Sequence, residues 1–155
     1  MGDRVLGPYR QGQEVELPFW ITAHLVGMGY AKFKDEDQLT TKSLSTTHYK
    51  ESLPGSRDLP KLPKSFYFQL RRLLKDLKSQ EAKDRAMGRE LDKALGLARD
   101  IVGIRIRKIA NLAASGEHPA ELTSNLTAEE VALFEKVRKQ VDSWRKEILG
   151  RDSDR

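Results

Sequence analysis

The fold is decided by residues 84–114, which read DRAMGRELDKALGLARDIVGIRIRKIANLAA. Apolar side chains recur through this stretch at helical spacing, which predicts one long helix. They form two stripes: the first consists of Leu91, Leu95, Ala98, Val102, Ile109 and Leu112, and the second of Ala94, Leu97, Ile101 and Ile104. Because a helix that is apolar on two sides must be covered on two sides, we expect it to be the central helix of a bundle.

Two further amphipathic helices are predicted, one before and one after the central helix. The earlier one has a single apolar face made of Phe66, Leu70, Leu73, Leu74 and Leu77. The later one begins after Thr127, which forms a capping-box pattern with Glu130. Its apolar stripe consists of Val131, Phe134, Val137, Val141, Trp144 and Ile148. Residues 63–150 are therefore predicted to form a helical bundle domain of about three to four helices, followed by a polar tail at 151–155.

The N-terminal part of the chain has shorter periods and more turn residues. Short strands are predicted at 5–9, 14–17 and 30–34, with a helix at 18–26 between the last two. Residues 1–36 thus read as a small α+β module with the order strand, strand, helix, strand. Residues 37–62 read as a connecting helix and linker with turns at its prolines. The predicted fold class is mainly α with a small N-terminal α+β module.

The composition excludes several classes of site. The 155 residues contain no cysteine, which rules out disulfide scaffolds, cysteine-based zinc sites and thiol nucleophiles. His24, His48 and His118 fall in different segments and form no metal-ligand pair. No apolar run is long enough to span a bilayer, and the N-terminus lacks the pattern of a signal peptide. We therefore expect a soluble intracellular protein that is not an enzyme and that uses no cofactor, metal or membrane.

Basic residues cluster on the helix that starts at Phe66. The chain has 28 basic and 23 acidic residues, and its formal net charge is +5. The cluster consists of Arg71, Arg72, Lys75 and Lys78. One interpretation is a solvated helix face, helped by the neighbouring Asp76 and Glu81. The other is contact with nucleic-acid phosphates without reading of the base sequence.

Three charged residues interrupt the most apolar helix: Asp100, Arg105 and Lys108. A charge on a buried helix face costs several kcal/mol unless it is paired. Arg105 can pair with a carboxylate on a neighbouring helix of the same chain or with one on another chain. The sequence leaves both alternatives open, and we treat these three residues as candidates for partner binding.

Large apolar residues provide the other candidates for partner binding. Phe19, Trp20, Phe134 and Trp144 have the character of interface anchors, although such residues also build ordinary cores. With Val141 they give the chain more apolar helix surface than a small bundle needs for its own core. Some of that surface is expected to be covered by another chain.

Three ordered motifs resemble the GINS family. Leu6-Gly7-Pro8-Tyr9 followed by Glu14-Val15-Glu16-Leu17-Pro18-Phe19-Trp20 is similar to the N-terminal module of the class whose small β-rich domain comes first. Leu62-Pro63-Lys64-Ser65-Phe66-Tyr67 resembles the start of the family's helical domain, and residues 100–109 resemble its "D-[IL]-x-x-x-R-x-x-K" helix. Gly103 departs from that pattern, in which an acidic residue is common. The length resembles the archaeal type, which is related to the eukaryotic Psf-two/Psf-three class.

The resemblance implies a scaffold subunit of a DNA replication complex. It implies a 2:2 heterotetramer with a domain-permuted GINS subunit, which bridges the MCM helicase to a RecJ-like or Cdc-type protein. Contact with DNA would be weak, and the location cytoplasmic in an archaeon or nuclear in a eukaryote. The alternative hypothesis is a basic helical nucleic-acid-binding module that acts without GINS partners and binds DNA with a steep salt dependence.

Overall fold

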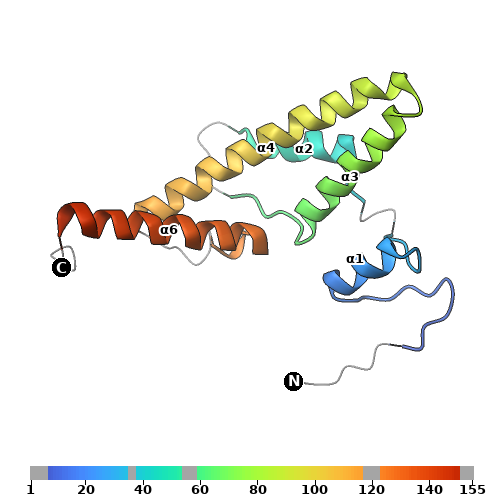
Figure 1. The fold of residues 1–155 in the computed structure, drawn as a ribbon, viewed down its shortest axis with the longest axis horizontal. Helices are drawn as coiled ribbons and strands as arrows, with labels where there is room; N and C mark the ends of the chain where they lie inside the picture. Colours follow the sequence, from blue (N-terminus) through green and yellow to red (C-terminus); the bar gives the residue numbers. More distant parts are fainter. Residues whose placement is uncertain (1–6, 35–37, 54–58, 117–122, 151–155) are drawn as a thin grey trace. The chain divides into compact units, whose positions relative to one another are not determined.

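The computed structural model describes residues 7–34, 38–53, 59–116 and 123–150. The chain divides into two compact units, Met1–Gln38 and Leu39–Arg155. The first unit carries helix α1 (Phe19–Gly27). The second carries the helices shown in Figure 1: α2 (Thr41–Glu51), α3 (Phe66–Glu81), the short 3-10 turn η2 (Arg85–Met87), α4 (Gly88–Ser115) and α6 (Ala128–Leu149).

The first unit confirms the predicted helix and turn. Helix α1 follows Pro18, and Gly29, with a φ of 79°, ends it in the left-handed conformation. The turn predicted at Gln11-Gly12 forms and is closed by the hydrogen bond from Gln13 N to the carbonyl of Arg10. Gly12 takes a φ of 81°, which a residue with a Cβ rarely adopts.

The strands predicted at 5–9, 14–17 and 30–34 are not confirmed. Residues 7–18 and 31–34 contain no strand, and residues 5 and 6 lie outside the described residues. Residues 14 and 34 approach each other, since Lys34 Nζ lies 3.6 Å from Glu14 Oε2, but no ladder joins their backbones. Alternating sequence forms a strand when one face is buried. Here Tyr9, Val15 and Tyr30 are exposed, so that packing is missing within the unit.

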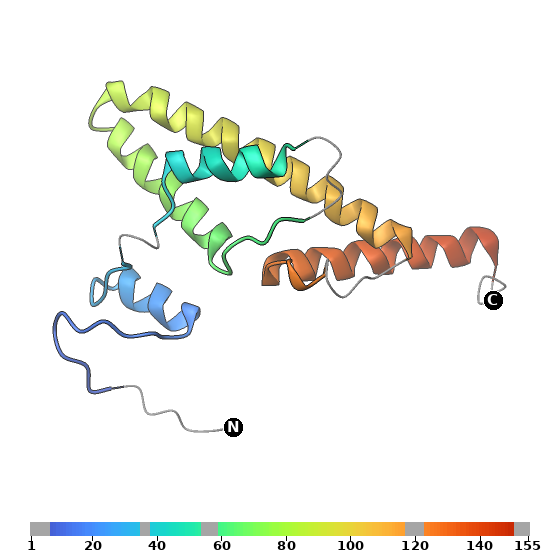
Figure 2. The same ribbon diagram turned by 180° about the vertical axis from the view of Figure 1, so that it is seen from behind.

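Helix α2 belongs to the second unit, whereas the sequence interpretation placed residues 37–62 in a connecting segment. Its start is fixed by a capping box between Thr40 and Ser43. Leu44 is buried in the same core as α3 and α4, and α2 packs along α4 (Figure 2). The polar sequence of α2 hides this role, because only three of its residues are buried: Thr41, Leu44 and Glu51.

A helical hairpin of α3 and α4 builds the first hydrophobic core. Phe66, Leu70 and Leu77 are buried on α3, as its apolar stripe predicts. They pack with Leu44, Leu62 and the N-terminal half of α4, which contributes Leu91, Ala94, Ala98 and Ile101. The two predicted stripes of α4 therefore merge into one wide buried face. Its partly buried borders include Leu95, Leu97 and Val102.

Helix α6 packs against the C-terminal half of α4 and builds the second hydrophobic core. This core consists of Leu59, Ile109, Leu112, Ala113 and Phe134. The predicted capping box at Thr127 and Glu130 is confirmed, and Gly116 ends α4 with a φ of 76°. Glu130 lies beside Arg105, and Arg145 donates to the carbonyl of Ala114. Helix α6 thus starts beside the middle of α4 and runs past its C-terminal end (Figure 1).

Candidate functional site

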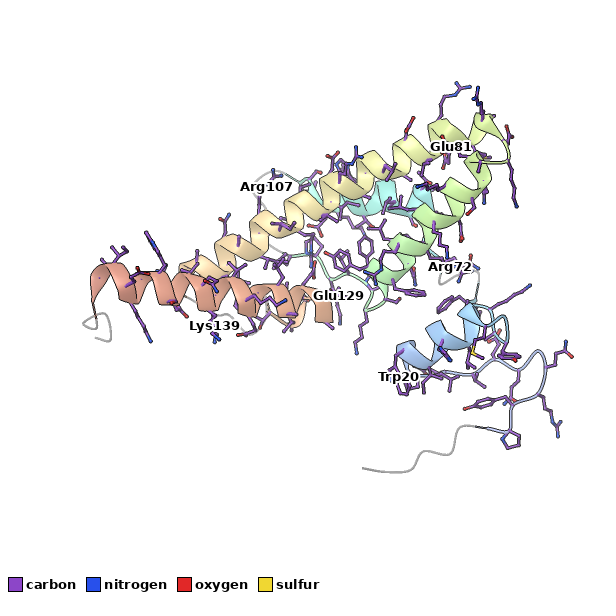
Figure 3. All side chains as sticks on the ribbon, viewed as in Figure 1. Trp20, Arg72, Glu81, Arg107, Glu129 and Lys139 are labelled. Atoms are coloured by element: carbon purple, nitrogen blue, oxygen red, sulfur yellow. The ribbon has the colours of Figure 1, made fainter. Side chains whose placement is uncertain are left out.

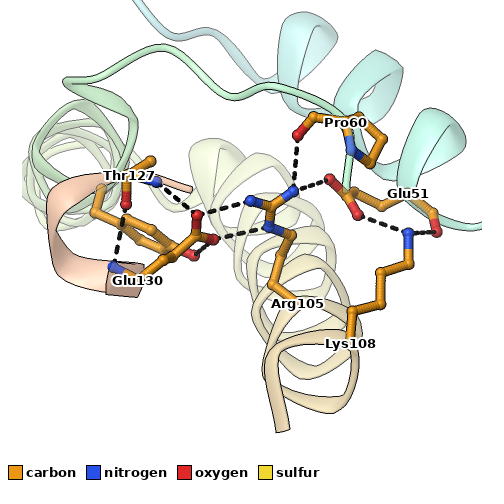
Figure 4. Close-up of polar contacts among 7 residues, drawn as sticks. Glu51, Pro60, Arg105, Lys108, Thr127 and Glu130 are labelled. Atoms are coloured by element: carbon orange, nitrogen blue, oxygen red, sulfur yellow. Dashed lines mark hydrogen bonds and ion pairs between the residues drawn. The ribbon is translucent and has the colours of Figure 1, made fainter. Parts of the chain in front are cut away.

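Arg105 lies on the buried face of α4, between the two hydrophobic cores. Its side chain has an exposed fraction of 0%. The guanidinium donates two hydrogen bonds to Glu130, from Nε to Oε1 and from Nη2 to Oε2, each 2.7 Å long. Its Nη1 donates to Glu51 Oε1 at 3.0 Å and to the carbonyl of Pro60 at 2.8 Å (Figure 4). This parallel two-bond pairing with a carboxylate is the strongest geometry that arginine forms.

Three more residues complete the network around Arg105, two through their side chains and one through its backbone N–H. The Tyr67 hydroxyl donates to Glu130 Oε1 at 2.7 Å. Lys108 Nζ donates to Glu51 Oε2 at 3.1 Å and to the backbone carbonyl of Glu51 at 3.2 Å. Thr127 N donates to Glu130 Oε2 at 2.9 Å as part of the capping box. Two cations therefore face two carboxylates, and the buried cluster is formally neutral.

This network ties together α2, α3, α4 and α6. Arg105 and Lys108 come from α4, Glu51 from α2, Tyr67 from α3 and Glu130 from α6. Ile101 belongs to the core on one side of Arg105, and Ile109 to the core on the other side. A fully satisfied polar cluster penalises any packing that leaves a member unpaired. We infer that the network sets the position of α2 and α6 along α4.

The protonation equilibria follow from these contacts. Burial alone would raise the pKa of Glu130, but hydrogen bonds from Arg105, Thr127 N and Tyr67, with the charge of Arg105, outweigh it and lower that pKa. Burial lowers the pKa of Arg105, but the bonds and charge of Glu130, followed by those of Glu51, more than reverse this. Burial, with the bond to Glu130, raises the pKa of Tyr67 far above its usual range. These shifts hold Arg105 and Glu130 in their ionised forms beside a neutral Tyr67 phenol.

The variant Glu130→Gln gives a pH-dependent prediction. Because folding lowers the pKa of Glu130 from 4.5, its ionised form stabilises the fold above that pH. This stability is lost as the pH falls through the folded-state pKa. Wild type should therefore be more stable than Glu130→Gln at neutral pH, and the gap should close on acidification.

Urea unfolding at a series of pH values measures this gap. Glu135→Gln is the matched control, because Glu135 is exposed on the same helix and its gap to wild type should stay small throughout. A gap for Glu130→Gln that does not change with pH would contradict the assignment.

The structure shows partners within the chain for the charges on α4. Arg105 and Lys108 pair within the chain. Asp100 is largely exposed, and its Oδ2 lies 3.5 Å from His48 Nε2 on α2. The partners that these three residues contact in the structure thus lie in their own chain. Arg105, being fully buried, presents no atom to a second protein.

The second half of α6 carries an apolar strip on one side that is largely exposed at its end. Phe134 is buried in the second core, and Val137 packs against that core. Beyond them Val141 is half-buried, whereas Trp144 and Ile148 have exposed fractions of 63% and 61%. Residues 137, 141, 144 and 148 are three or four apart and share one side of the helix. An apolar strip therefore leaves the core and continues along the exposed end of α6.

The remaining candidates lie on the surface or outside the described side chains. Trp20, labelled in Figure 3, has an exposed fraction of 73%, while the side chain of Phe19 lies outside the described residues. Arg71, Lys75 and Lys78 are exposed on α3. Arg72 is half-buried and pairs with Asp76, with 3.6 Å between its Nε and Asp76 Oδ2.

The described residues offer neither a metal site nor a membrane-spanning helix. Across 7–34, 38–53, 59–116 and 123–150, no group of His, Asp and Glu could hold a metal ion. Over the same ranges, no helix combines the length and hydropathy that crossing a bilayer requires. The features that remain are the buried network, the uncovered end of α6 and the basic residues of α3.

Comparison with known families decides between the interpretations. The family model for Sld5, the GINS complex protein helical bundle domain, matches residues 31–149. The chain belongs to the GINS family. Members of this family are non-catalytic subunits of a complex that acts in DNA replication. Comparison with curated proteins gives no match. The resemblance drawn from three motifs is thereby confirmed for the helical part of this GINS chain.

Sequence reasoning missed the partners of Arg105 in this GINS chain. Glu130 was recognised as a capping residue, but nothing nearby in the sequence shows that it also holds Arg105. Glu51 lies at the end of a polar helix, and Tyr67 was read only as part of a motif. Burial of an arginine on α4 does imply carboxylate partners, but their identity depends on which helices pack there.

Proposed function

We propose that this GINS chain is a non-catalytic scaffold subunit that bridges and activates the replicative MCM helicase. It assembles with a domain-permuted GINS subunit into a 2:2 heterotetramer, which also holds a RecJ-like or Cdc-type replication protein. The chain works in the cytoplasm of an archaeon or the nucleus of a eukaryote. Membership of the GINS family supports the assignment to a GINS complex. The exposed apolar strip on α6 supports binding to another subunit through that helix.

The single observation that carries this proposal is the uncovered end of α6. An exposed apolar strip on a charge-rich chain is costly in water unless another surface covers it. Val141, Trp144 and Ile148 present this strip on a helix that projects past α4. We expect a helix of a second GINS subunit to cover it, because ridges of one apolar helix pack into the grooves of another.

The buried network supports a scaffold rather than an enzyme. Its charged groups are satisfied by one another and have little or no exposure. A catalytic group must reach a substrate and change its protonation or bonding during a reaction. Arg105, Glu51 and Glu130 instead hold three helices in a fixed arrangement, which is what a rigid docking platform requires. Trp20 in the first unit is a second proposed contact, made by the small module.

Co-expression with the domain-permuted GINS subunit tests the proposal. Purification through a tag on that subunit should recover this chain, and light scattering should give a mass equal to two copies of each chain. Addition of the MCM helicase should then shift the complex to a larger mass. A chain that stays monomeric and stable in the presence of these partners would contradict the proposal.

A further inference from the structure

Residues 61–78 form a segment with a large excess of positive charge. Residues 61–78 contain six basic residues (Lys61, Lys64, Arg71, Arg72, Lys75 and Lys78) and one acidic residue, Asp76, so their net charge is +5. The whole chain has 28 basic and 23 acidic residues. The rest therefore has 22 of each, 28 − 6 and 23 − 1, and is formally neutral. An excess of five positive charges within so short a segment creates a strong local field.

Helix α3 orders part of this charge into a stripe. Arg71, Lys75 and Lys78 are four and three residues apart, so they lie on one side of α3. We call these three residues the basic stripe. All three are exposed, and within the described parts of the chain none of them forms an ion pair. Asp76 pairs with Arg72, off this stripe. The stripe is therefore positive and available to solvent.

The surface around the basic stripe has the character of a phosphate-binding face. None of the large apolar residues that the structure exposes in its described residues lies on α3. Protein interfaces are anchored by aromatic and aliphatic side chains that become buried on binding. Trp144 on α6 is a residue of this kind, and α3 exposes none among its described residues. Binding to a nucleic-acid backbone needs only cations at the right spacing. The stripe is about 10 Å long. A DNA duplex carries one phosphate charge per about 1.7 Å of its axis, so the same length of duplex carries roughly six charges.

We propose that the exposed face of α3 binds the phosphate backbone of nucleic acid through Arg71, Lys75 and Lys78. The contact carries no base specificity, because the stripe offers charge without side chains that read base edges. Three contacts give weak binding that serves to hold DNA near an assembly anchored by other surfaces. This role is additional to the scaffold function and uses a different helix from the uncovered end of α6.

Fluorescence anisotropy with the full chain tests this proposal. The probes are a labelled single-stranded oligothymidylate and a duplex of mixed sequence. Three phosphate contacts predict that the logarithm of the association constant falls with the logarithm of salt concentration with a slope of about −2 for the single strand and about −2.7 for the duplex. Between about 50 and 200 mM salt this is a loss of roughly 20-fold and 40-fold. The larger affinity at low salt identifies which form the stripe prefers.

The decisive variant is Arg71→Ala, Lys75→Ala, Lys78→Ala. It should bring the salt slope close to zero and leave the melting temperature unchanged, because all three side chains are exposed. The matched control is Lys42→Ala, Lys50→Ala, Lys136→Ala, which removes the same charge from exposed positions on α2 and α6 and should keep the wild-type slope. Equal slopes for the two variants would overturn the proposal, as would a wild-type chain that binds neither probe. Tighter binding to polyglutamate than to either oligonucleotide would assign the face to an acidic protein instead.

Discussion

Replacement of Arg105 by alanine is expected to lower the free energy of unfolding by about 3–5 kcal/mol. The substitution leaves Glu130 buried without its cation, whereas Glu51 keeps Lys108. It also removes the hydrogen bond that Arg105 donates to the carbonyl of Pro60. Most of the cost therefore comes from an uncompensated buried charge rather than from lost attraction. In a domain of this size the melting temperature should fall by about 10–20 °C.

Urea or thermal unfolding of the purified variant measures this effect. Arg107→Ala is the matched control, because Arg107 (Figure 3) is an exposed arginine of the same helix and its loss should cost no more than about 0.5 kcal/mol. Arg105→Lys should fall between the two, since a lysine keeps the charge but cannot make two parallel bonds to Glu130. If Arg105→Ala and Arg107→Ala unfold alike, the structural role given to the network is wrong.

Replacement of Trp144 by glutamate should strongly weaken assembly and change the stability of the chain little, unlike the substitution of Arg105. An exposed tryptophan contributes little to its own fold, so the free energy of unfolding of the chain should change by less than about 0.5 kcal/mol. At the centre of an interface the same residue is worth about 2 kcal/mol or more. Association with the GINS partner should therefore weaken by at least about 30-fold.

Analytical ultracentrifugation of the chain with its partner measures this association. Lys139→Glu is the control, because Lys139 (Figure 3) is exposed on the side of α6 away from residues 137, 141, 144 and 148. It introduces a carboxylate into the same helix and should leave association unchanged. Equal loss of association in the two variants would mean that charge, rather than the apolar strip, governs assembly.

Helices with a local signature could be predicted from the sequence. The capping box at Thr127 and Glu130 marks the start of α6, and Gly116 marks the end of α4, because both are signals contained within a few residues. The apolar stripe of α3 is likewise local. The strands predicted near Val15 and Tyr30 were not confirmed, because a strand depends on pairing and burial that its own sequence does not supply.

The buried network could be predicted only in part. The position of Arg105 on an apolar face implies a carboxylate partner, and the structure supplies two from within the chain. Their identity required knowledge of how α2 and α6 pack on α4. Phe134 was a candidate interface anchor but is buried in the core, whereas Trp144 on the same stripe is exposed. The apolar stripe of α6 keeps the same spacing along the whole helix, so the sequence of α6 does not show where its contact with α4 ends.

The positions of Arg105, Lys108 and Trp144 show which of the candidate residues can contact a partner. Arg105 and Lys108 act inside the bundle, where they fix the helices that carry the surface. The surface itself is the strip that continues from Val137 to Ile148. Stability and assembly should therefore respond to different substitutions, at Arg105 and at Trp144.

Hydrogen exchange of α6, compared between the free chain and the GINS assembly, tests the central claim most directly. In the free chain, amides at 138–149 should exchange faster than those at 131–137, because only the earlier part packs on the second core. On assembly, exchange at 138–149 should slow strongly, while 131–137 should change little. Unchanged exchange at 138–149 in a complex that has formed would contradict the claim that this end of α6 is the docking surface.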